Sequence, residues 1–349
     1  MIDERIKKDL KEIVEELKDF EDKIRGQTFL VTGGAGFLGT WFCDVLNEFG
    51  ADIICVDNFI VGNKNNIDHL MNNKNFKFIQ ADILDYEPDE KIDYIIHMAC
   101  IASPMVYFEH PIETLDSSVI ATKKMLELGI KNKIKGFLLT STSEIYGNPP
   151  NDVIPTPETF HGIIHTTSSR AMYDEGKRVA ETYTYYYWKK HGVPVRIARI
   201  FNTYGPRLDS GLATTYGRAL INFVRQAKAN EPITIFGDGK QTRSFCYVVD
   251  TMVGLFKLLL TDGLDGEIIN IGNDKEITIL DLAKKIIKTT GSKSEIKTNS
   301  QPAHYNIKDD PKRRCPDISK AKKLLNYEPR FKIDEGLNRV VEDIKISNK

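Results

Sequence analysis

The chain carries the run Val31-Thr32-Gly33-Gly34-Ala35-Gly36-Phe37-Leu38-Gly39 between an apolar segment and a segment with helical spacing. Residues 28–32 are predicted to form a buried strand, and residues 38–49 a helix. Gly33, Gly36 and Gly39 are spaced G-x-x-G-x-x-G. The first glycine permits a tight turn, the second lets backbone approach a pyrophosphate, and the third allows close packing of helix on sheet. We predict a dinucleotide site; the alternative is a glycine-rich turn in another kind of α/β protein.

Acidic residues follow two later predicted strands. Asp57 comes 18 residues after Gly39 and directly after the apolar residues 53–56. A carboxylate at this place accepts hydrogen bonds from an adenosine ribose and repels a 2′-phosphate, so we expect NAD rather than NADP. Asp82 and Ile83 fit a contact with the adenine ring, but acids at strand ends are also common where no ligand binds.

Strands and helices alternate as far as residue 200, which predicts right-handed βαβ units and a parallel sheet. Further strands are predicted at 52–56, 76–79, 94–98, 136–140 and 195–200, with helices at 123–128 and around Tyr173. Beyond residue 201 the pattern is irregular, with helices predicted at 215–229, 250–260, 279–289 and 317–325 and strands at 233–236 and 266–271. We therefore predict an α/β fold, in which a Rossmann-type doubly wound parallel sheet is joined by a smaller mixed α/β substrate-binding domain.

The composition favours a cytoplasmic enzyme. A net charge of −1 lacks the basic excess of a nucleic-acid binder. Five scattered cysteines without a CxxC pair indicate reduced thiols, and the histidines show no metal-ligand spacing, so no metal site is expected. No run of about 18 apolar residues is present, and the charged N-terminus is not a signal peptide. Residues 1–25 have apolar residues at helical spacing, which predicts a helix. This helix docks either on the main body or on a second subunit; the alternative is a solvated helix with a weak core contact.

The segment Tyr173-Asp174-Glu175-Gly176-Lys177 places a phenol and an ammonium four residues apart. On a helix both side chains rise from one face, one turn apart. A nearby cation stabilises phenolate, so Tyr173 is a candidate general base for oxidation of an alcohol. Taken alone, the pair is also compatible with an ordinary solvated helix; the glycine run upstream favours the catalytic interpretation.

Together, the glycine run and the Tyr173–Lys177 pair resemble the extended short-chain dehydrogenase/reductase superfamily, over about residues 26–340. Further phrases are similar to its UDP-glucuronate decarboxylase (UDP-xylose synthase) family. These phrases are Asp57-Asn58-Phe59, Ala102-Ser103-Pro104, the runs 141–147 (STSEIYG) and 173–181 (YDEGKRVAE), the runs 198–207 (ARIFNTYGPR) and 241–248 (QTRSFCYV), and Arg314-Cys315-Pro316-Asp317-Ile318. The most specific of them is YDEGKRVAE.

This resemblance implies a division of the chain and a set of cofactor residues. It implies an N-terminal helical extension (1–25), an NAD-binding Rossmann domain (26–201 with 245–272) and a nucleotide-sugar-binding domain (202–244 with 273–349). The cofactor residues it implies are Gly33, Gly36, Phe37, Leu38, Asp57, Asn58, Asp82, Ile83, Tyr173 and Lys177.

The resemblance also implies a reaction. Tyr173 takes the proton from a sugar 4-hydroxyl while NAD takes the hydride, and the resulting 4-ketone, β to the C6 carboxylate, favours loss of carbon dioxide. Thr142 and Glu144 position the sugar and move protons. Arg314 matches a family arginine near the sugar carboxylate or the point of proton delivery to C5, and an arginine fork suits a carboxylate. The dehydratase relatives carry an acid where this chain has Ser143, which is a poor acid for expelling hydroxide. The alternatives are a buried structural carboxylate at Glu144 and a surface charge at Arg314.

For the UDP group, the resemblance points to Asn202, Arg207, Gln241 and Arg243, with an apolar slot near Ile235 and Phe236; structural salt bridges are the alternative for the arginines. The chain departs from the family in the 161–170 loop and at Ser117-Ser118, where an asparagine is usual. The superfamily commonly forms homodimers through two helices of each subunit, here near 115–129 and 173–191.

Three functions follow, in order of preference. The first is NAD-dependent decarboxylation of UDP-glucuronate to UDP-xylose through a 4-keto intermediate, with internal return of the hydride. The second is another nucleotide-sugar reaction, a 4-epimerase or a 4,6-dehydratase. The third is a non-catalytic nucleotide-binding regulator, which the presence of Tyr173, Lys177 and Glu144 disfavours.

Overall fold

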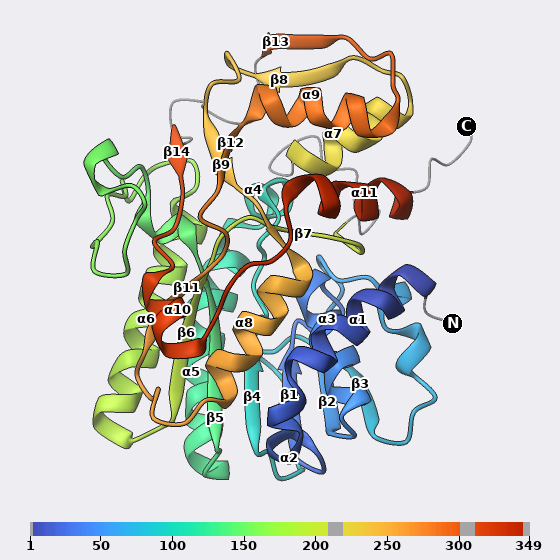
Figure 1. Cartoon of the computed structure of the whole chain (residues 1–349). Helices are drawn as coiled ribbons and strands as arrows, with labels where there is room; N and C mark the ends of the chain where they lie inside the picture. Colours follow the sequence, from blue (N-terminus) through green and yellow to red (C-terminus); the bar gives the residue numbers. More distant parts are fainter. Residues whose placement is uncertain (1–2, 209–218, 301–310, 345–349) are drawn as a thin grey trace.

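A parallel sheet of seven strands forms the centre of the protein, which confirms the predicted fold class (Figure 1). The computed structural model describes residues 3–208, 219–300 and 311–344. The strand order is β11-β6-β5-β4-β1-β2-β3, and every neighbouring pair is parallel. The strands are β1 (Thr28–Thr32), β2 (Asp52–Asp57), β3 (Phe76–Gln80), β4 (Tyr94–His97), β5 (Gly136–Thr142), β6 (Val195–Ile200) and β11 (Ile268–Ile271).

Helices cover both faces of the sheet, which is why its strands are apolar almost throughout. Phe29 and Val31 of β1 pack in one cluster with α3 (Phe37–Glu48) and α8 (Val248–Leu260). Leu30, between them, points to the other face and packs in a second cluster with α5 (Pro111–Asn132) and α6 (Ala171–His191). Helix α4 (Pro104–Glu109) precedes α5.

The N-terminal residues dock on the main body. Helix α1 (Glu4–Glu16) packs against α3 and α8 and buries Ile6, Leu10 and Ile13, and α2 (Glu21–Ile24) leads into β1. The carboxylate of Asp9 is buried, where it accepts hydrogen bonds from Tyr247 and Arg339. The extension therefore joins the sheet-covering helices to the C-terminal part of the chain.

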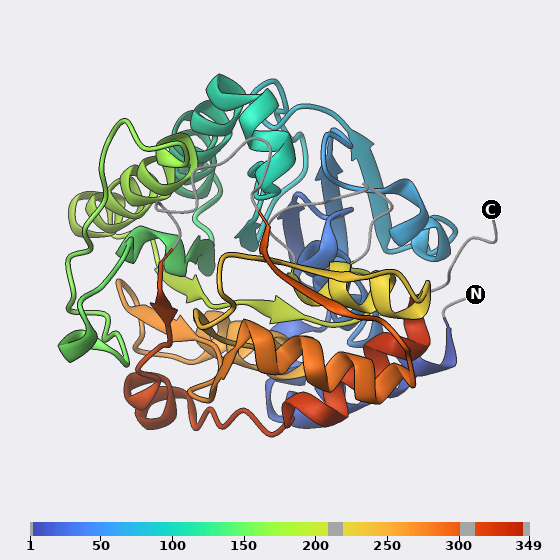
Figure 2. The ribbon, with the colours of Figure 1, turned by 90° about the horizontal axis from the view of Figure 1, so that it is seen from above.

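A smaller lobe lies above the sheet in Figure 1. Strand β8 (Ile233–Phe236) pairs in parallel with β13 (Ile296–Ser300), beside α7 (Ala219–Lys228), α9 (Ile279–Thr290) and α11 (Ile333–Asp343). Seen from above, α5 and α6 lie on the side of the molecule opposite α9 and α11 (Figure 2). Of the helix predicted at 215–229, residues 215–218 lie outside the described residues.

Short strands connect the lobe with the sheet. A three-stranded sheet has the order β12-β9-β14, and β10 pairs with β7. Their bounds are β7 (Thr203–Tyr204), β9 (Thr242–Ser244), β10 (Cys246–Tyr247), β12 (Glu276–Thr278) and β14 (Arg313–Arg314), with helix α10 (Ser319–Leu325) after them. Among the helices of the described residues, none has the length and apolar character needed to cross a membrane.

Candidate active site

The glycine run forms the predicted tight turn between β1 and α3. Gly33 has φ +71°, a left-handed conformation that favours glycine, and its N–H donates to the carbonyl of Val56. A Cβ at Gly39 would lie 2.3 Å from the carbonyl oxygen of Gly33, so helix α3 approaches the turn as closely as a glycine permits. The N-terminus of α3 follows directly, beside the turn.

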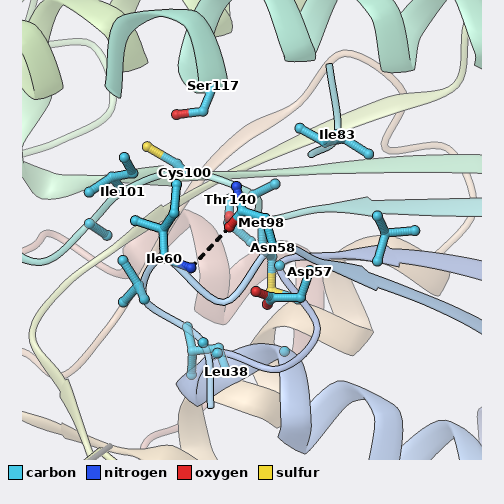
Figure 3. Close-up of a pocket in the computed structure, with 18 of the residues that line it drawn as sticks. Leu38, Asp57, Asn58, Ile60, Ile83, Met98, Cys100, Ile101, Ser117 and Thr140 are labelled. Atoms are coloured by element: carbon cyan, nitrogen blue, oxygen red, sulfur yellow. Dashed lines mark hydrogen bonds between the residues drawn. The ribbon is translucent and has the colours of Figure 1, made fainter. Parts of the chain in front are cut away.

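A cavity of 340 Å³ opens at the carboxyl ends of β1, β2 and β4 (Figure 3). In this view Leu38 of α3 and Ser117 of α5 lie at opposite sides of it, with Asp57 and Asn58 between them. The cavity is lined by all of the predicted cofactor residues, which are Gly33, Gly36, Phe37, Leu38, Asp57, Asn58, Asp82, Ile83, Tyr173 and Lys177. The glycine turn, the carboxylate of Asp57 and the phenol of Tyr173 therefore line the same cavity.

The carboxylate of Asp57 also holds the walls of this cavity in place. It accepts hydrogen bonds from the backbone N–H of Ala35, at 3.0 Å, and of Phe59, at 2.8 Å. Burial raises the pKa of Asp57, while these hydrogen bonds oppose the shift. The side-chain amide of Asn58 donates to Asp82 at 3.1 Å. Hydrogen bonds within the protein thus fix Asp57, the acid that would meet the ribose. The glycine turn, the N-terminus of α3 and this acid together fit an adenine dinucleotide.

Tyr173 and Lys177 rise from one face of α6 toward β5. The ammonium of Lys177 donates to the carbonyl of Thr140 at 2.9 Å, and the hydroxyl of Tyr173 is hydrogen-bonded to Thr142. The ring of Tyr173 stacks on Tyr107, with centroids 5.6 Å apart and planes 13° from parallel. The predicted helical pair is therefore present, buried and directed into the cavity.

The electrostatics of Tyr173 correct one expectation. Burial raises the pKa of Tyr173 well above its ordinary value, with Cys100 and Glu144 acting in the same direction, and the hydrogen bond from Thr142 offsets only part of the shift. The expected acidification by Lys177 does not dominate because the phenol is desolvated and faces acidic groups, whereas the ammonium is bonded to Thr140. Without a cofactor, Tyr173 is a neutral phenol.

Glu144 lies between two arginines next to this phenol. It follows Thr142 in the 3₁₀ turn η4 (Ser143–Tyr146), and the remaining predicted residue of this turn, Ser143, is buried. Arg170 contacts the carboxylate at 2.7 Å, and Arg314 binds both of its oxygens, one of them at 2.6 Å. Burial disfavours the charged form, but the two arginines outweigh it and lower the pKa of Glu144 to about 2.

Arg243 adds a third positive charge to this cluster. It is the register partner of Arg314 in the pair β9–β14, and its charge also acts on Glu144. Its guanidinium donates to the carbonyls of Thr242 and Pro311, each at 2.8 Å. Three arginine guanidiniums thus act on the carboxylate of Glu144.

The other residues predicted to bind UDP have different kinds of partner in the structure. Asn202 donates to the carbonyl of Ser244 at 3.2 Å, and Gln241 to that of Phe236 at 3.0 Å, and neither residue lines the 340 Å³ cavity. Arg207 instead pairs with the buried carboxylate of Asp44 in α3, and its side chain is only 8% exposed. This placement favours the structural salt bridge over a diphosphate contact at Arg207.

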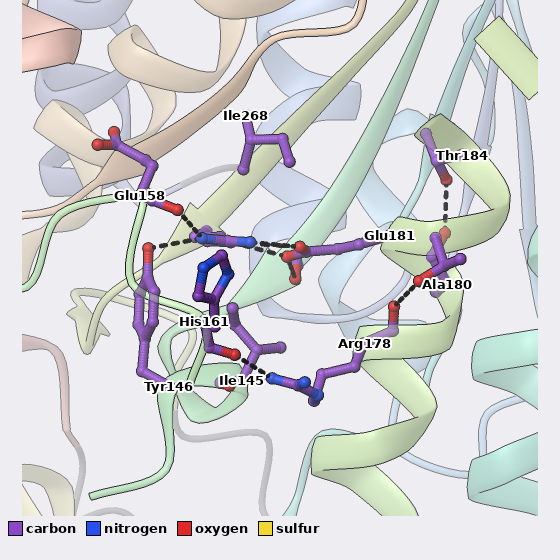
Figure 4. Close-up of polar contacts among 12 residues, drawn as sticks. Ile145, Tyr146, Glu158, His161, Arg178, Ala180, Glu181, Thr184 and Ile268 are labelled. Carbon is purple, nitrogen blue, oxygen red and sulfur yellow. Dashed lines mark hydrogen bonds and ion pairs between the residues drawn. The ribbon is translucent and has the colours of Figure 1, made fainter. Parts of the chain in front are cut away.

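The sequence analysis did not predict a buried network of hydrogen bonds and an ion pair next to η4 (Figure 4). Arg199 of β6 pairs with Glu181 of α6 at 2.7 Å and donates to the hydroxyl of Tyr146 and to the carbonyl of Glu158, each at 2.9 Å. Glu181 stands one turn beyond Lys177, which is the spacing that indicates a shared face. The network joins α6 to the turn that carries Glu144.

Comparison with known proteins agrees with this geometry. The profile of the NAD dependent epimerase/dehydratase family matches residues 29–272. The chain belongs to this family. UDP-glucuronic acid decarboxylase 4 of Arabidopsis thaliana is 44% identical over 319 residues, which cover 90% of this chain and 68% of that protein.

Two solved structures of similar fold are epimerases. An epimerase from Methanothermobacter thermautotrophicus has a TM-score of 0.82 at 28% identity, covering 95% of this chain and 94% of that one. A UDP-glucuronic acid 4-epimerase from Bacillus cereus, in complex with UDP-glucuronic acid and NAD, has a TM-score of 0.79 at 29% identity, covering 91% and 98%. Among the described residues of the present chain, no group of His, Cys, Asp and Glu side chains is arranged to hold a metal ion.

Proposed function

We propose that this protein is an NAD-dependent enzyme that decarboxylates UDP-glucuronate to UDP-xylose through a 4-keto intermediate. The observation that supports it most is Glu144, which Arg170 and Arg314 hold and whose charge acts on Tyr173. A base for a sugar hydroxyl near arginines suited to a carboxylate is what this reaction requires. The relatives named UDP-glucuronic acid decarboxylase, at 42–44% identity, support the same substrate.

The first step is removal of the proton from the sugar 4-hydroxyl by Tyr173. Thr142, hydrogen-bonded to Tyr173, orients that hydroxyl. NAD, when bound, supplies the acceptor for the C4 hydride and a positive charge near the phenol. Because Tyr173 is neutral before binding, its ionisation depends on Lys177 and on the cationic ring. We expect Gly33, Gly36, Phe37, Leu38, Asp57, Asn58, Asp82 and Ile83 to hold this cofactor.

The second step is loss of carbon dioxide from the β-keto acid. The C5–C6 bond breaks, and its electron pair moves onto the C4 oxygen as an enolate. The high pKa of Tyr173 suits this step, because the protonated phenol donates to the developing oxyanion. C5 then takes a proton, and return of the hydride to C4 completes the product. Arg314 and Arg170 orient the carboxylate until it leaves.

A 4-epimerase is the second candidate, because the Bacillus cereus structure of similar fold acts on the same uronate. An epimerase retains the carboxylate, so the two reactions differ in carbon dioxide release. Dehydration is disfavoured because Ser143, a poor acid, stands next to Thr142. On the lobe side, we propose that Asn202, Gln241 and Arg243 bind the UDP group and that the chain functions as a homodimer through α5 and α6.

The deciding experiment incubates the protein and NAD with UDP-glucuronate labelled with ¹³C at C6, and with UDP-glucose and dTDP-glucose. We expect labelled carbon dioxide and UDP-xylose from the first substrate only, measured by mass spectrometry. An epimerised uronate with its carboxylate retained would support the second candidate. Tyr173→Phe is expected to abolish turnover while NAD still binds; equal behaviour of both proteins in every assay would instead favour a non-catalytic binder.

A further inference from the structure

Asp174, the residue after Tyr173, is a buried acid that the reaction above does not use. Its residue exposure is 7%, and its Oδ1 atom has no hydrogen-bond partner among the described residues. A buried, unpaired carboxylate oxygen costs free energy, so its presence calls for a physical reason. The candidates for a partner are the arginines next to Glu144.

Both of these arginines are bonded to the other acid. Arg314 binds the two oxygens of Glu144, and Arg170 contacts the same carboxylate. Of the two acids near these arginines, Glu144 is the one that both guanidiniums are seen to bind. Asp174 is near enough for the charge of Glu144 to act on it, yet its Oδ1 atom accepts no hydrogen bond from the described residues.

Charged groups face Asp174 from three elements. Glu144 comes from η4, Arg314 from β14, Glu175 from α6 and Arg170 from the N-cap of α6; the phenol of Tyr173 is the adjoining neutral group. Burial and the charge of Glu144 outweigh the two arginines and raise the pKa of Asp174 to about 7. The same surroundings therefore lower the pKa of Glu144 and raise that of Asp174, so that the pKa values of the two acids are pushed apart.

We propose that Asp174 is a positioning residue that takes up one proton from solvent when a uronate carboxylate enters the arginine cluster, and releases it after carbon dioxide has left. This inference rests on the proposed function. The entering carboxylate is a third acid beside Glu144 and Asp174, and a like charge favours the neutral form of the group that titrates most easily. Protonation removes the charge of Asp174 beside the entering carboxylate, while Glu144 stays paired with Arg170 and Arg314.

The coupling distinguishes substrate from product. UDP-glucuronate brings the additional carboxylate, whereas UDP-xylose lacks it. A ligand whose binding takes up a proton binds more weakly when protons are scarce. The affinity for UDP-glucuronate should therefore fall several-fold as the pH rises from 6 to 8. The affinity for UDP-xylose should stay nearly constant over the same range.

The test is calorimetry of binding in two buffers of different ionisation enthalpy, with NAD present, using Tyr173→Phe protein so that no turnover occurs. At pH 7 we expect uptake of about half a proton per UDP-glucuronate, since a group with a pKa of about 7 is half protonated there, and near zero for UDP-xylose. Adding Asp174→Asn should abolish the uptake, and Asp174→Glu should restore part of it. Asp334→Asn, which removes an exposed carboxylate of α11 that pairs with Lys285, is the matched control and should leave the uptake unchanged.

The outcomes separate the two levels of the proposal. Tight binding of UDP-glucuronate with equal proton uptake in the Asp174→Asn protein, or with none in the parent, overturns the role of Asp174 while the proposed function stands. Failure of both UDP-sugars to bind overturns the proposed function itself. Circular dichroism and NAD binding establish that each variant is folded, and the conservative Asp174→Glu protein distinguishes a titrating role from a packing role.

Discussion

The ammonium of Lys177 donates a 2.9 Å hydrogen bond to the carbonyl of Thr140, two residues before Thr142 in β5. One turn earlier on α6, Tyr173 is hydrogen-bonded to Thr142 itself, and one turn later Glu181 accepts from Ser141 at 2.5 Å. A single stripe of α6 is thus bonded to consecutive residues of one strand. The position of the phenol is set by this register rather than by the pair alone.

Lys177→Met should lower turnover by about 100-fold or more, because it removes the positive charge that favours ionisation of Tyr173. The pKa of Tyr173 is already raised by burial, so the remaining activity should rise toward alkaline pH more steeply than in the parent protein. Initial rates between pH 6 and 10 measure this. Lys189→Met, on the same helix but over the ring of Trp188, should leave the rates unchanged. An unaltered pH profile in Lys177→Met would contradict the assigned role.

Arg314→Gln should raise the KM for UDP-glucuronate about 10-fold or more, and leave the affinity for UDP-xylose within about 2-fold, because only the uronate carries the carboxylate that the arginine would meet. The melting temperature should also fall, since Glu144 loses one of its two buried partners. Arg313→Gln is the matched control, because Arg313 is the neighbour of Arg314 in β14 but pairs with Glu276 and is 35% exposed. Equal effects on substrate and product would assign Arg314 to stability alone.

The local features of the site were predictable because their partners are close in the sequence. The glycine run fixes a turn between adjacent elements, and Tyr173 and Lys177 share a helix face through their spacing alone. The sheet followed from runs of apolar residues, because parallel strands are buried on both faces. These inferences required no long-range contact.

The remaining features depend on long-range pairing. Arg314 meets Glu144 across 170 residues, and Arg207 meets Asp44 across 163, so neither partner is visible in a local pattern. Strands β7, β10 and β14 have two residues each, too few for a periodicity, and α11 was also missed. The pKa of Tyr173 was misjudged for the same reason, because burial and distant acids determine it rather than the lysine one turn away.

His97 should make the protein less stable in acid. Thr32 accepts from the N–H groups of Met98 and Ala99, so its single hydroxyl proton goes to Nδ1 of His97, at 2.8 Å. Nε2 then carries the imidazole proton and donates to Thr122 at 3.1 Å. Burial, assisted by the charge of Lys177, lowers the pKa of His97 to about 3.

Because the folded pKa lies below the unfolded value of about 6.5, the stability that neutral His97 contributes is complete above pH 6.5 and is lost as the pH falls toward 3. The loss approaches about 1.4 kcal/mol for each pH unit in that window. Urea unfolding of the parent and of His97→Gln measures it: the variant should be less stable at pH 7, and the difference should shrink by pH 5. His191→Gln, at the exposed end of α6, should show a constant difference. A parallel pair of curves for His97→Gln would exclude the proposed titration.

Charges placed on the outer face of α5 and α6 should separate a homodimer into monomers. Five large apolar side chains of the described residues are exposed on these two packed helices, namely Ile112 (64%), Ile120 (52%), Ile130 (41%), Val179 (39%) and Tyr186 (63%). Scattered single apolar residues are ordinary on a surface, but a group on adjacent helices is typical of a covered face. Ile120→Lys with Tyr186→Lys would bury two charges in such an interface, at a cost that a standard-size contact does not offset.

Light scattering after size-exclusion chromatography should show the parent as a dimer near twice 39.7 kDa and the double variant near 39.7 kDa. Met71→Lys, an exposed apolar residue outside these helices, is the control and should remain dimeric. A parent protein that is monomeric at every concentration, with normal turnover, would exclude this interface.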